Sequence, residues 1–225
     1  LQSAFEDRGT QGVVLLINSP GGSPVQAGLI NDEIRRLRAK HPATPLYAVV
    51  EDMCASGGYY VAAAADRIFV DKASIVGSIG VLMDGFGFTG TMEKLGVERR
   101  LLTAGENKGF LDPFSPQEPR HLEHAKSLLS DVHKQFIEVV RKGRANRLKE
   151  TPETFSGLMW TGEQSISMGL ADSLGSVDFV AREVVKAERI RDFTQKSNFA
   201  ERLAKQLGTA SGEAMAGLLS QMRLR

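Results

Sequence analysis

Met53-Cys54-Ala55-Ser56-Gly57-Gly58-Tyr59-Tyr60 is the stretch that decides the fold, because it joins an expected strand at 46–50 to an expected helix at 58–65. The glycines after Ser56 leave its hydroxyl without steric cover. Backbone N–H groups at the start of a helix stabilise developing negative charge. A serine in that position has what an acyl-transfer nucleophile needs. The alternative is that Ser56 only caps the helix and that the glycines fit a tight turn.

Short apolar segments alternate with helical patterns on both sides of this stretch. A continuous apolar run at 12–17, rich in β-branched residues, predicts a buried parallel strand. A strong loop signal follows it at 18–24, and further strands are expected at 67–70 and 98–102. Strands that alternate with helices indicate an α/β layered fold with a mostly parallel sheet.

The helices are expected from the spacing of their apolar residues. Leu29, Ile30, Ile34 and Leu37 recur at helical intervals in a helix that ends near His41. The other expected helices cover 91–95, 116–148, 161–169 with Gly169 as its C-cap, and 177–190. The apolar side of the long helix is expected to consist of Leu122, Ala125, Leu128, Leu129, Val132, Phe136, Ile137 and Val140. The tail at 199–225 is weakly amphipathic, and helix, disorder and a partner-binding segment all stay open.

The composition is that of a globular protein with a sizeable core: 225 residues, 42% hydrophobic and 24% charged. A net charge of +1 creates no field that would attract nucleic acid, so no nucleic-acid partner is expected. No apolar run approaches the roughly 18 residues of a membrane span. The single cysteine, Cys54, can form no internal disulfide. Residues 1–5 resemble the middle of a helix, so a further N-terminal segment is expected to precede them.

A serine nucleophile needs a base, and histidine is the usual one. None of the four histidines follows an expected strand end, where an α/β scaffold presents catalytic groups. They are His41, His121, His124 and His133, of which His121 and His124 are expected to be solvated. A histidine base is therefore disfavoured.

Lysine is the alternative base, and it must be neutral to accept a proton. Burial can lower the pKa of a lysine from about 10.4 toward neutrality. Lys108 is favoured because it directly follows an expected strand and has Gly105 and Gly109 on either side. Lys72 and Lys94 compete less well, since one is expected in an exposed turn and the other on a short helix. An exposed loop lysine is the plain alternative for Lys108.

The third requirement is a pair of donors for the oxyanion. Pro20-Gly21-Gly22 follows a buried strand, and glycine lets the backbone approach a substrate closely. The N–H groups of Gly22 and Gly57 are expected to form this pair. A phosphate-binding loop is the competing interpretation, but the Gly-Lys-Ser/Thr ending and the Gly-x-Gly-x-x-Gly spacing are both missing. Nothing in the sequence resembles a tetrahedral N/S ligand set, so no metal and no cofactor are expected.

Together these motifs resemble the signal peptide peptidase A-type serine peptidases. The segments at 18–22, 55–60, 77–81 and 105–108 occur in that family's order and spacing, and those at 112–114, 161–162 and 169–172 also match. The resemblance covers roughly residues 12–175. It departs from the family pattern at Cys54, Asn107 and Ser165, none of which removes the serine or the lysine.

The resemblance implies a crotonase-like α/β fold, shared with the Clp-type proteolytic subunits, and a Ser/Lys dyad. In that pattern Ser56 is the nucleophile, Lys108 is the general base, and Gly22 and Gly57 are the oxyanion donors. The substrate groove would be lined by Gly21, Ser78, Ile79 and Gly80. Its backbone could pair with an extended peptide added as a strand.

Family members are usually anchored by an N-terminal transmembrane helix, form rings or domes, and cleave remnant signal peptides. The resemblance therefore implies peptide substrates, a homo-oligomer, and an anchor that this chain does not contain. It implies the bacterial inner membrane, with the catalytic domain on the periplasmic or extracytoplasmic side. We expect a peptidase domain at 1–176 and a C-terminal helical extension at 177–225. Two other functions stay open: a catalytically silent scaffold, and an acyl-CoA hydratase or isomerase of the crotonase type.

Overall fold

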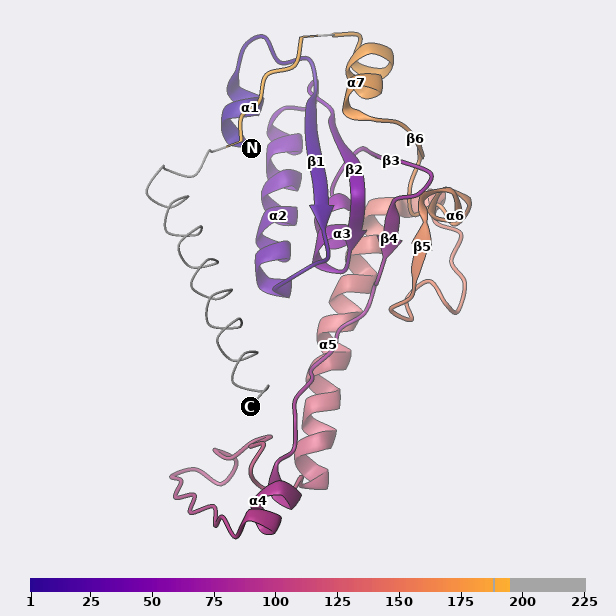
Figure 1. Ribbon diagram of the computed structural model, residues 1–225. Coiled ribbons are helices and arrows are strands. Elements are labelled where there is room, and N and C mark those ends of the chain that lie inside the picture. The colour runs from indigo at the N-terminus through magenta and orange to yellow at the C-terminus, as the bar shows by residue number, and fades with distance from the viewer. Residues whose placement is uncertain (188, 195–225) are drawn as a thin grey trace, which may run out of the picture. The chain divides into compact units, whose positions relative to one another are not determined.

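The computed structural model describes residues 1–187 and 189–194 (Figure 1). The chain divides into two units, Leu1–Ile190 and Arg191–Arg225, and the elements described below all belong to the first. The first unit ends at Ile190, and the expected division into a peptidase domain at 1–176 and a helical extension stays a prediction. The tail at 199–225, for which three states stayed open, lies outside the described residues.

A six-stranded, mostly parallel sheet forms the centre of the first unit. Its main path runs β5 (Met159–Thr161), β4 (Ile75–Gly77), β2 (Leu46–Ala55), β3 (Arg67–Val70) and β6 (Ser173–Leu174), and β1 (Val13–Ser19) also pairs with β2. Among the strand pairs of the described residues, only β4–β5 is antiparallel. The mixed α/β class expected from the sequence is therefore confirmed.

The strand β2 is longer than the expected 46–50 and reaches the residue before Ser56. Its first half pairs with β1 and β3, from Leu46 opposite Val13 onward. Its second half pairs with β4, where Ala55 lies opposite Gly77. The polar residues Glu51 and Asp52 interrupt the apolar pattern without ending the strand, because both are exposed. This extension carries the chain directly into the serine turn.

The sheet is buried on both faces. Val49 and Phe69 on one face contact Val180, which follows the helix α7 (Val177–Phe179). Ala48 and Ile68, which alternate with them and so face the other side, are fully buried. The helix α2 (Pro24–Lys40) contributes Ile34 and Leu37 to the core. The expected stripe on that helix is only half confirmed, because Leu29 and Ile30 are exposed.

Three further helices stand close to their expected positions. The short α3 (Gly57–Ala62) follows Ser56, and α6 (Gly162–Ser167) is capped by Thr161. Gly169 follows α6 with a φ of 74°, which fits the expected C-cap. The long helix is α5 (Pro119–Arg144), somewhat shorter than 116–148, and ends in a 3-10 turn at Ala145–Arg147. A short helix, α1 (Gln2–Glu6), begins the chain.

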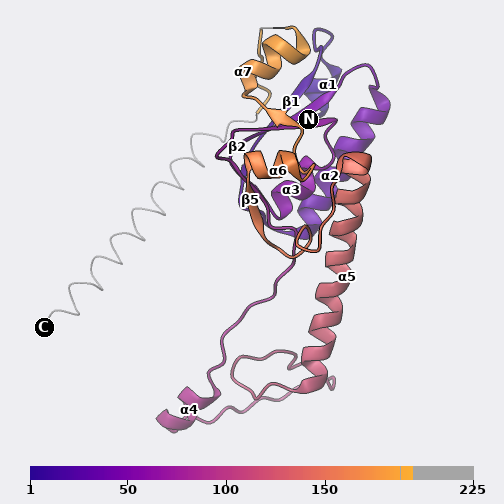
Figure 2. The same cartoon turned by 90° about the vertical axis from the view of Figure 1, so that its right-hand side faces the viewer.

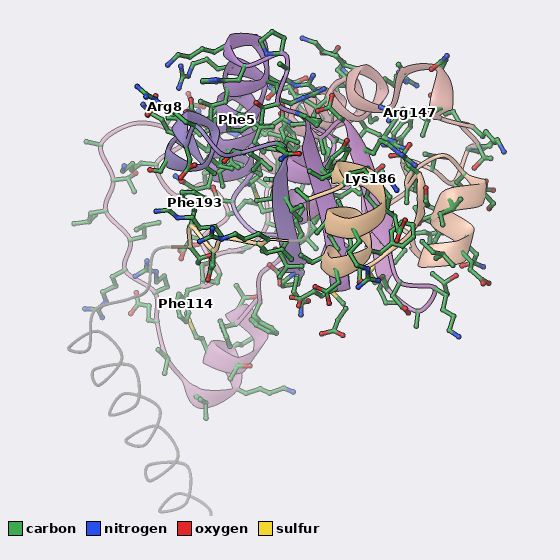
Figure 3. The ribbon with its side chains drawn as sticks, turned by 90° about the horizontal axis from the view of Figure 1, so that it is seen from above. Phe5, Arg8, Phe114, Arg147, Lys186 and Phe193 are labelled. Atoms are coloured by element: carbon green, nitrogen blue, oxygen red, sulfur yellow. The ribbon has the colours of Figure 1, made fainter. Side chains whose placement is uncertain are left out.

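The segment at 83–118, called the arm, leads away from the sheet after β4 and ends where α5 begins. It contains α4 (Thr89–Leu95), close to the expected helix at 91–95. Figures 1 and 2 show α4 at the N-terminal end of α5, away from the sheet. Seen from above, the labelled Phe114 also lies on the arm, whereas Arg147 lies beside the sheet (Figure 3).

Two expected elements are wrong. Residues 98–102 form no strand, because the arm offers no neighbouring strand with which their backbone could pair. Leu102 is accordingly 97% exposed. The expected helix at 177–190 is only α7 followed by a π-helical segment, Val180–Val185. It ends at Lys186, whose φ of 62° is left-handed. The sequence pattern reveals neither change. Strand pairing depends on residues far away in the chain, and the apolar spacing of a π-helix is nearly the same as that of an α-helix.

Among the described residues, no helix is both long enough and apolar enough to cross a membrane.

Candidate active site

Ser56 stands at the sharp turn between β2 and α3 with a backbone φ of 50° and ψ of −121°. A positive φ is strained for any residue with a Cβ, and such strain is concentrated at functional turns. The Ser56 N–H donates to the Gly77 carbonyl at 2.9 Å, which holds the turn against β4. Its side chain makes no capping hydrogen bond, so the alternative of a simple helix cap is wrong.

The glycine loop after β1 packs directly against this turn. Gly21 and Gly22 have φ values of 120° and 147°, which residues with a side chain rarely adopt. A Cβ at Gly21 would lie 2.7 Å from the Ser56 Cβ and 3.1 Å from its Oγ. A Cβ at Gly57 would lie 3.3 Å from the Gly22 nitrogen. The backbones of Gly22 and Gly57 are thus neighbours beside the hydroxyl, as an oxyanion pair requires.

The two tyrosines that follow the turn fix its surroundings. Tyr59 is fully buried and donates its hydroxyl to the Leu170 carbonyl at 2.7 Å, which ties α3 to the chain after α6. The ring of Tyr60 lies 5.0 Å from that of Phe136 on α5. The side chain of Asn31 on α2 donates to the Tyr60 carbonyl at 2.7 Å. The turn is therefore held by α2, α5 and the segment after α6 together.

A cavity of about 450 Å³ opens beside Ser56. Gly22 and Gly57 lie at one side of it, and its apolar lining includes Tyr60 and Phe136. The remaining lining residues are Pro24, Ser78, Gly80, Val81, Leu82, Val132, Ser156 and Gly157. A cavity with a serine hydroxyl, two neighbouring backbone N–H groups and an apolar lining can bind an extended chain with an apolar side chain inserted.

The segment after β4 lies in this cavity only in part. Ser78 and Gly80 line it, but Ile79 is fully buried. Several of its backbone groups are already engaged: the Ser78 N–H donates to the Leu158 carbonyl at 2.7 Å, and the Gly80 N–H to the Ser78 carbonyl at 2.9 Å. Pairing of a substrate strand with this segment stays a prediction, and these two N–H groups would have to be released before they could take part in it.

Lys108 does not lie with Ser56 within one chain. It is exposed on the arm, and its neighbour Asn107 bonds to His121 in the first turn of α5. Phe136, which contacts Tyr60 near the nucleophile, follows fifteen positions later on the same helix. At 1.5 Å per residue the two points are about 22 Å apart. A lysine side chain spans only a fraction of that distance.

The histidines differ from expectation in one respect. His124 is exposed, as expected, but His121 is only 8% exposed because the arm covers it. His133 bonds through Nε2 to the Ile79 carbonyl at 3.1 Å, so it supports the segment after β4. His41 packs against Phe5 with ring centroids 5.6 Å apart.

Cys54 lies two positions before Ser56 and is fully buried. Burial raises the pKa of its thiol well above the ordinary value. This cysteine is a core residue in β2 and not a second nucleophile.

The helical part of the pocket could not be predicted from the sequence. Val132 and Phe136 belong to the expected apolar stripe, which is normally core, and nothing in the stripe indicates that its middle lies beside Ser56. Ser156 and Gly157 were missed because they lie in a loop without a recognisable motif. The passage of α5 beside α3 brings Val132 and Phe136 to the cavity, whereas Ser156 and Gly157 reach it because their loop pairs with the segment after β4.

Comparison with known proteins finds one matching family and several similar proteins. Residues 38–209 match the profile of Peptidase family S49. The Na(+)/H(+) antiporter NhaA of Brucella melitensis is 48% identical over 177 residues, which are 79% of this chain and 24% of that protein. A protein of Enterococcus faecium named as a signal peptide peptidase, SppA, is 30% identical over 194 residues, or 86% of this chain and 56% of its own length. Protease 4 of Haemophilus influenzae is 30% identical over 190 residues, which are 84% of this chain and 30% of that protein. The chain thus spans about half the length of these relatives, or less.

Proposed function

Because this chain belongs to peptidase family S49, we propose that it is an endopeptidase in which Ser56 attacks the substrate and Lys108 is the base. Family membership makes it a serine peptidase. The observation that carries the residue assignment is the strained Ser56 turn, with the Gly21-Gly22 loop packed against it. Membership in a peptidase family also disfavours an acyl-CoA hydratase or a silent scaffold.

The mechanism follows from the chemistry of these groups. Lys108 Nζ takes the Ser56 Oγ proton as the oxygen attacks the peptide carbonyl carbon. The N–H groups of Gly22 and Gly57 bind the resulting oxyanion, and one such donor is typically worth about 3 kcal/mol of barrier. The C–N bond breaks as the Lys108 ammonium returns the proton to the leaving amine. Water, deprotonated by Lys108, then hydrolyses the acyl-enzyme ester and frees Ser56.

We propose that Lys108 serves the Ser56 of a second copy of the chain, so that the enzyme is a homo-oligomer. The separation along α5 supports this arrangement, since it keeps the two residues of one copy apart. A lysine acts as a base only in its neutral form, which burial favours. Lys108 is exposed within a single chain, and a second copy packed over the arm would bury it. Nine large apolar side chains of the segment 82–114 are exposed, which suits such a contact.

Mixing two inactive variants tests this arrangement. We expect Ser56→Ala and Lys108→Ala each to lose at least about 1,000-fold in kcat on a fluorogenic apolar peptide. Co-assembly of the two variants should restore a substantial fraction of wild-type activity, because Ser56 of one copy then meets Lys108 of the other. A dyad within one chain predicts no recovery, since neither copy carries both residues. Ser165→Ala, a buried substitution outside the cavity lining, is the control. Mixed with either inactive variant, it should give the same activity as the wild type mixed with that variant.

We further propose that the substrates are remnant signal peptides or other extended apolar peptides, cleaved at the bacterial inner membrane on its extracytoplasmic side. The apolar lining of the cavity, with Tyr60, Val132 and Phe136, supports an apolar side chain next to the cleaved bond. The relative named as a signal peptide peptidase supports the substrate class. Cleavage of a synthetic signal peptide at least about ten-fold faster than a polar peptide of equal length would agree with this. Recovery of the full-length protein only in the cytosolic fraction would contradict the membrane site.

A further inference from the structure

The loop that carries Lys108 is fastened to α5 on both sides of the lysine. Before it, the Glu106 carboxylate pairs with Arg120, and Asn107 Oδ1 lies 3.3 Å from His121 Nε2. After it, the Phe110 ring lies edge-on to His121 and His124, with centroids 5.4 and 5.6 Å away. The three partners occupy the first two turns of α5. Lys108 lies between these attachments along the chain and is exposed.

His121 is the centre of these attachments. It is 8% exposed, which is unusual for a histidine at the outer end of a helix. Since an amide oxygen can only accept, Nε2 carries the proton and donates it to Asn107. The same ring meets Phe110, so one side chain contacts the loop on both sides of Lys108.

The loop has little other support. A cavity of about 210 Å³ lies between it and the start of α5, lined by Glu106, Gly109 and His121 among others. Leu101 reaches the loop, since its Cδ2 would lie 3.1 Å from a Cβ at Gly109, but it stays 42% exposed, and Leu102 is 97% exposed. The main attachments of the loop to α5 are therefore Glu106 to Arg120, and Asn107 and Phe110 to His121.

We infer that His121 is a positioning residue for Lys108. It holds the lysine loop against α5, and α5 in turn lines the cavity of its own copy through Val132 and Phe136. Each copy thus presents its base at the end of a rigid helix at a fixed distance from its own nucleophile. This inference rests on the proposed function, in which Lys108 is the base.

Steady-state kinetics of the full chain test the inference. We expect His121→Ala to lower kcat at least about ten-fold while KM changes less than two-fold, because the ring touches the lysine loop and not the substrate. The oligomeric state and the melting temperature should stay those of the wild type. His121→Gln should recover most of the lost kcat, since its amide can still donate to Asn107. Glu123→Ala, an exposed neighbour on α5, serves as the control and should not change kcat.

The pH dependence of kcat provides a readout that a purely structural role would not alter. We expect the acidic limb of the profile to move in His121→Ala and to return toward the wild-type position in His121→Gln. The charged and titratable groups facing His121 are Glu118 on its own helix and Glu106 on the arm. Asp112 lines the same cavity.

The outcomes separate the two proposals. If Lys108→Ala, measured in the same series, keeps its activity, the base assignment fails and this inference fails with it. If Lys108→Ala is inactive but His121→Ala matches the wild type, only the positioning role is overturned. It is also overturned if His121→Ala and His121→Gln lose activity together with the oligomer, because His121 would then be needed only for assembly.

Discussion

At the scale of single residues, the site depends on backbone shape more than on side-chain chemistry. Ser56 adopts a positive φ of 50°, and Gly21, which packs against it, adopts a φ of 120°. The clearance is small, because a Cβ at Gly21 would approach the Ser56 Cβ to 2.7 Å. The glycine is therefore required both by its dihedral angle and by its neighbour.

Gly21→Ala should abolish peptidase activity. The added methyl would displace Ser56 or the Gly22 N–H, and a misplacement of about 1 Å can cost roughly 100-fold in rate. We expect a loss of kcat/KM of at least about 100-fold, measured with a fluorogenic peptide, and a melting temperature lowered by a few degrees. Gly28→Ala is the matched control, since its Cβ would meet only the Tyr60 hydroxyl at 4.0 Å. Equal activity in the two variants would contradict the proposed packing.

At the scale of elements, α5 takes part in both the cavity and the attachment of the Lys108 loop. Its middle lines the cavity beside Ser56, and its first turns hold the Lys108 loop about 22 Å away. The sequence pattern predicted the helix and its apolar side. Among those residues Ala125, Phe136 and Val140 are buried, whereas Leu128 is 43% exposed.

Val132→Phe should change the substrate preference. The larger ring would occupy part of the 450 Å³ cavity and exclude bulky apolar side chains. We expect kcat/KM to fall about 10- to 100-fold for a peptide with leucine next to the cleaved bond, and less than three-fold for one with alanine. Leu128→Phe, one turn away and exposed, should leave both values unchanged. An equal loss on both peptides would show that the cavity does not receive this side chain.

Elements with strong local signals were predicted well, and those that depend on distant partners were not. The strand at 67–70 is confirmed to the residue as β3, and the helix at 161–169 matches α6 with its caps. The segment at 98–102 has apolar residues but no neighbouring strand, so it lies extended on the arm. The burial of His121 was also unpredictable, because it results from the arm folding onto α5.

At the scale of the whole molecule, the crotonase and Clp-like layered fold implied by the resemblance is confirmed, since the chain belongs to family S49 and has the mixed sheet and long helix. One ionic cluster joins its parts. Arg144 at the end of α5, 1% exposed, donates two hydrogen bonds to Asp172 at 2.8 and 2.9 Å. Asp172 also accepts from the Ile68 N–H at 2.6 Å and contacts Arg147 at 3.2 Å. Figure 3 marks Arg147 beside the sheet.

This cluster makes the folded state sensitive to acid. Burial by itself would raise the pKa of the Asp172 carboxyl, but the hydrogen bonds and charge of Arg144, with Ile68 and Arg147, outweigh burial and lower it below 3.8. A carboxyl with a lowered pKa in the folded state stabilises that state above its unfolded pKa. The contribution is lost as the pH falls from about 4 through the lowered value.

Asp172→Asn should therefore lower stability most at neutral pH. Leaving Arg144 buried without its anionic partner typically costs about 3–5 kcal/mol, or roughly 10 °C in melting temperature. Thermal unfolding between pH 7 and pH 2.5 would measure this, and the difference between wild type and variant should shrink below about pH 4. Asp131→Asn removes an exposed pair with Lys134, where the carboxyl is 63% exposed, and should change stability by less than about 0.5 kcal/mol. A difference at Asp172 that stays constant with pH would mean that shape, and not charge, links the end of α5 to the sheet.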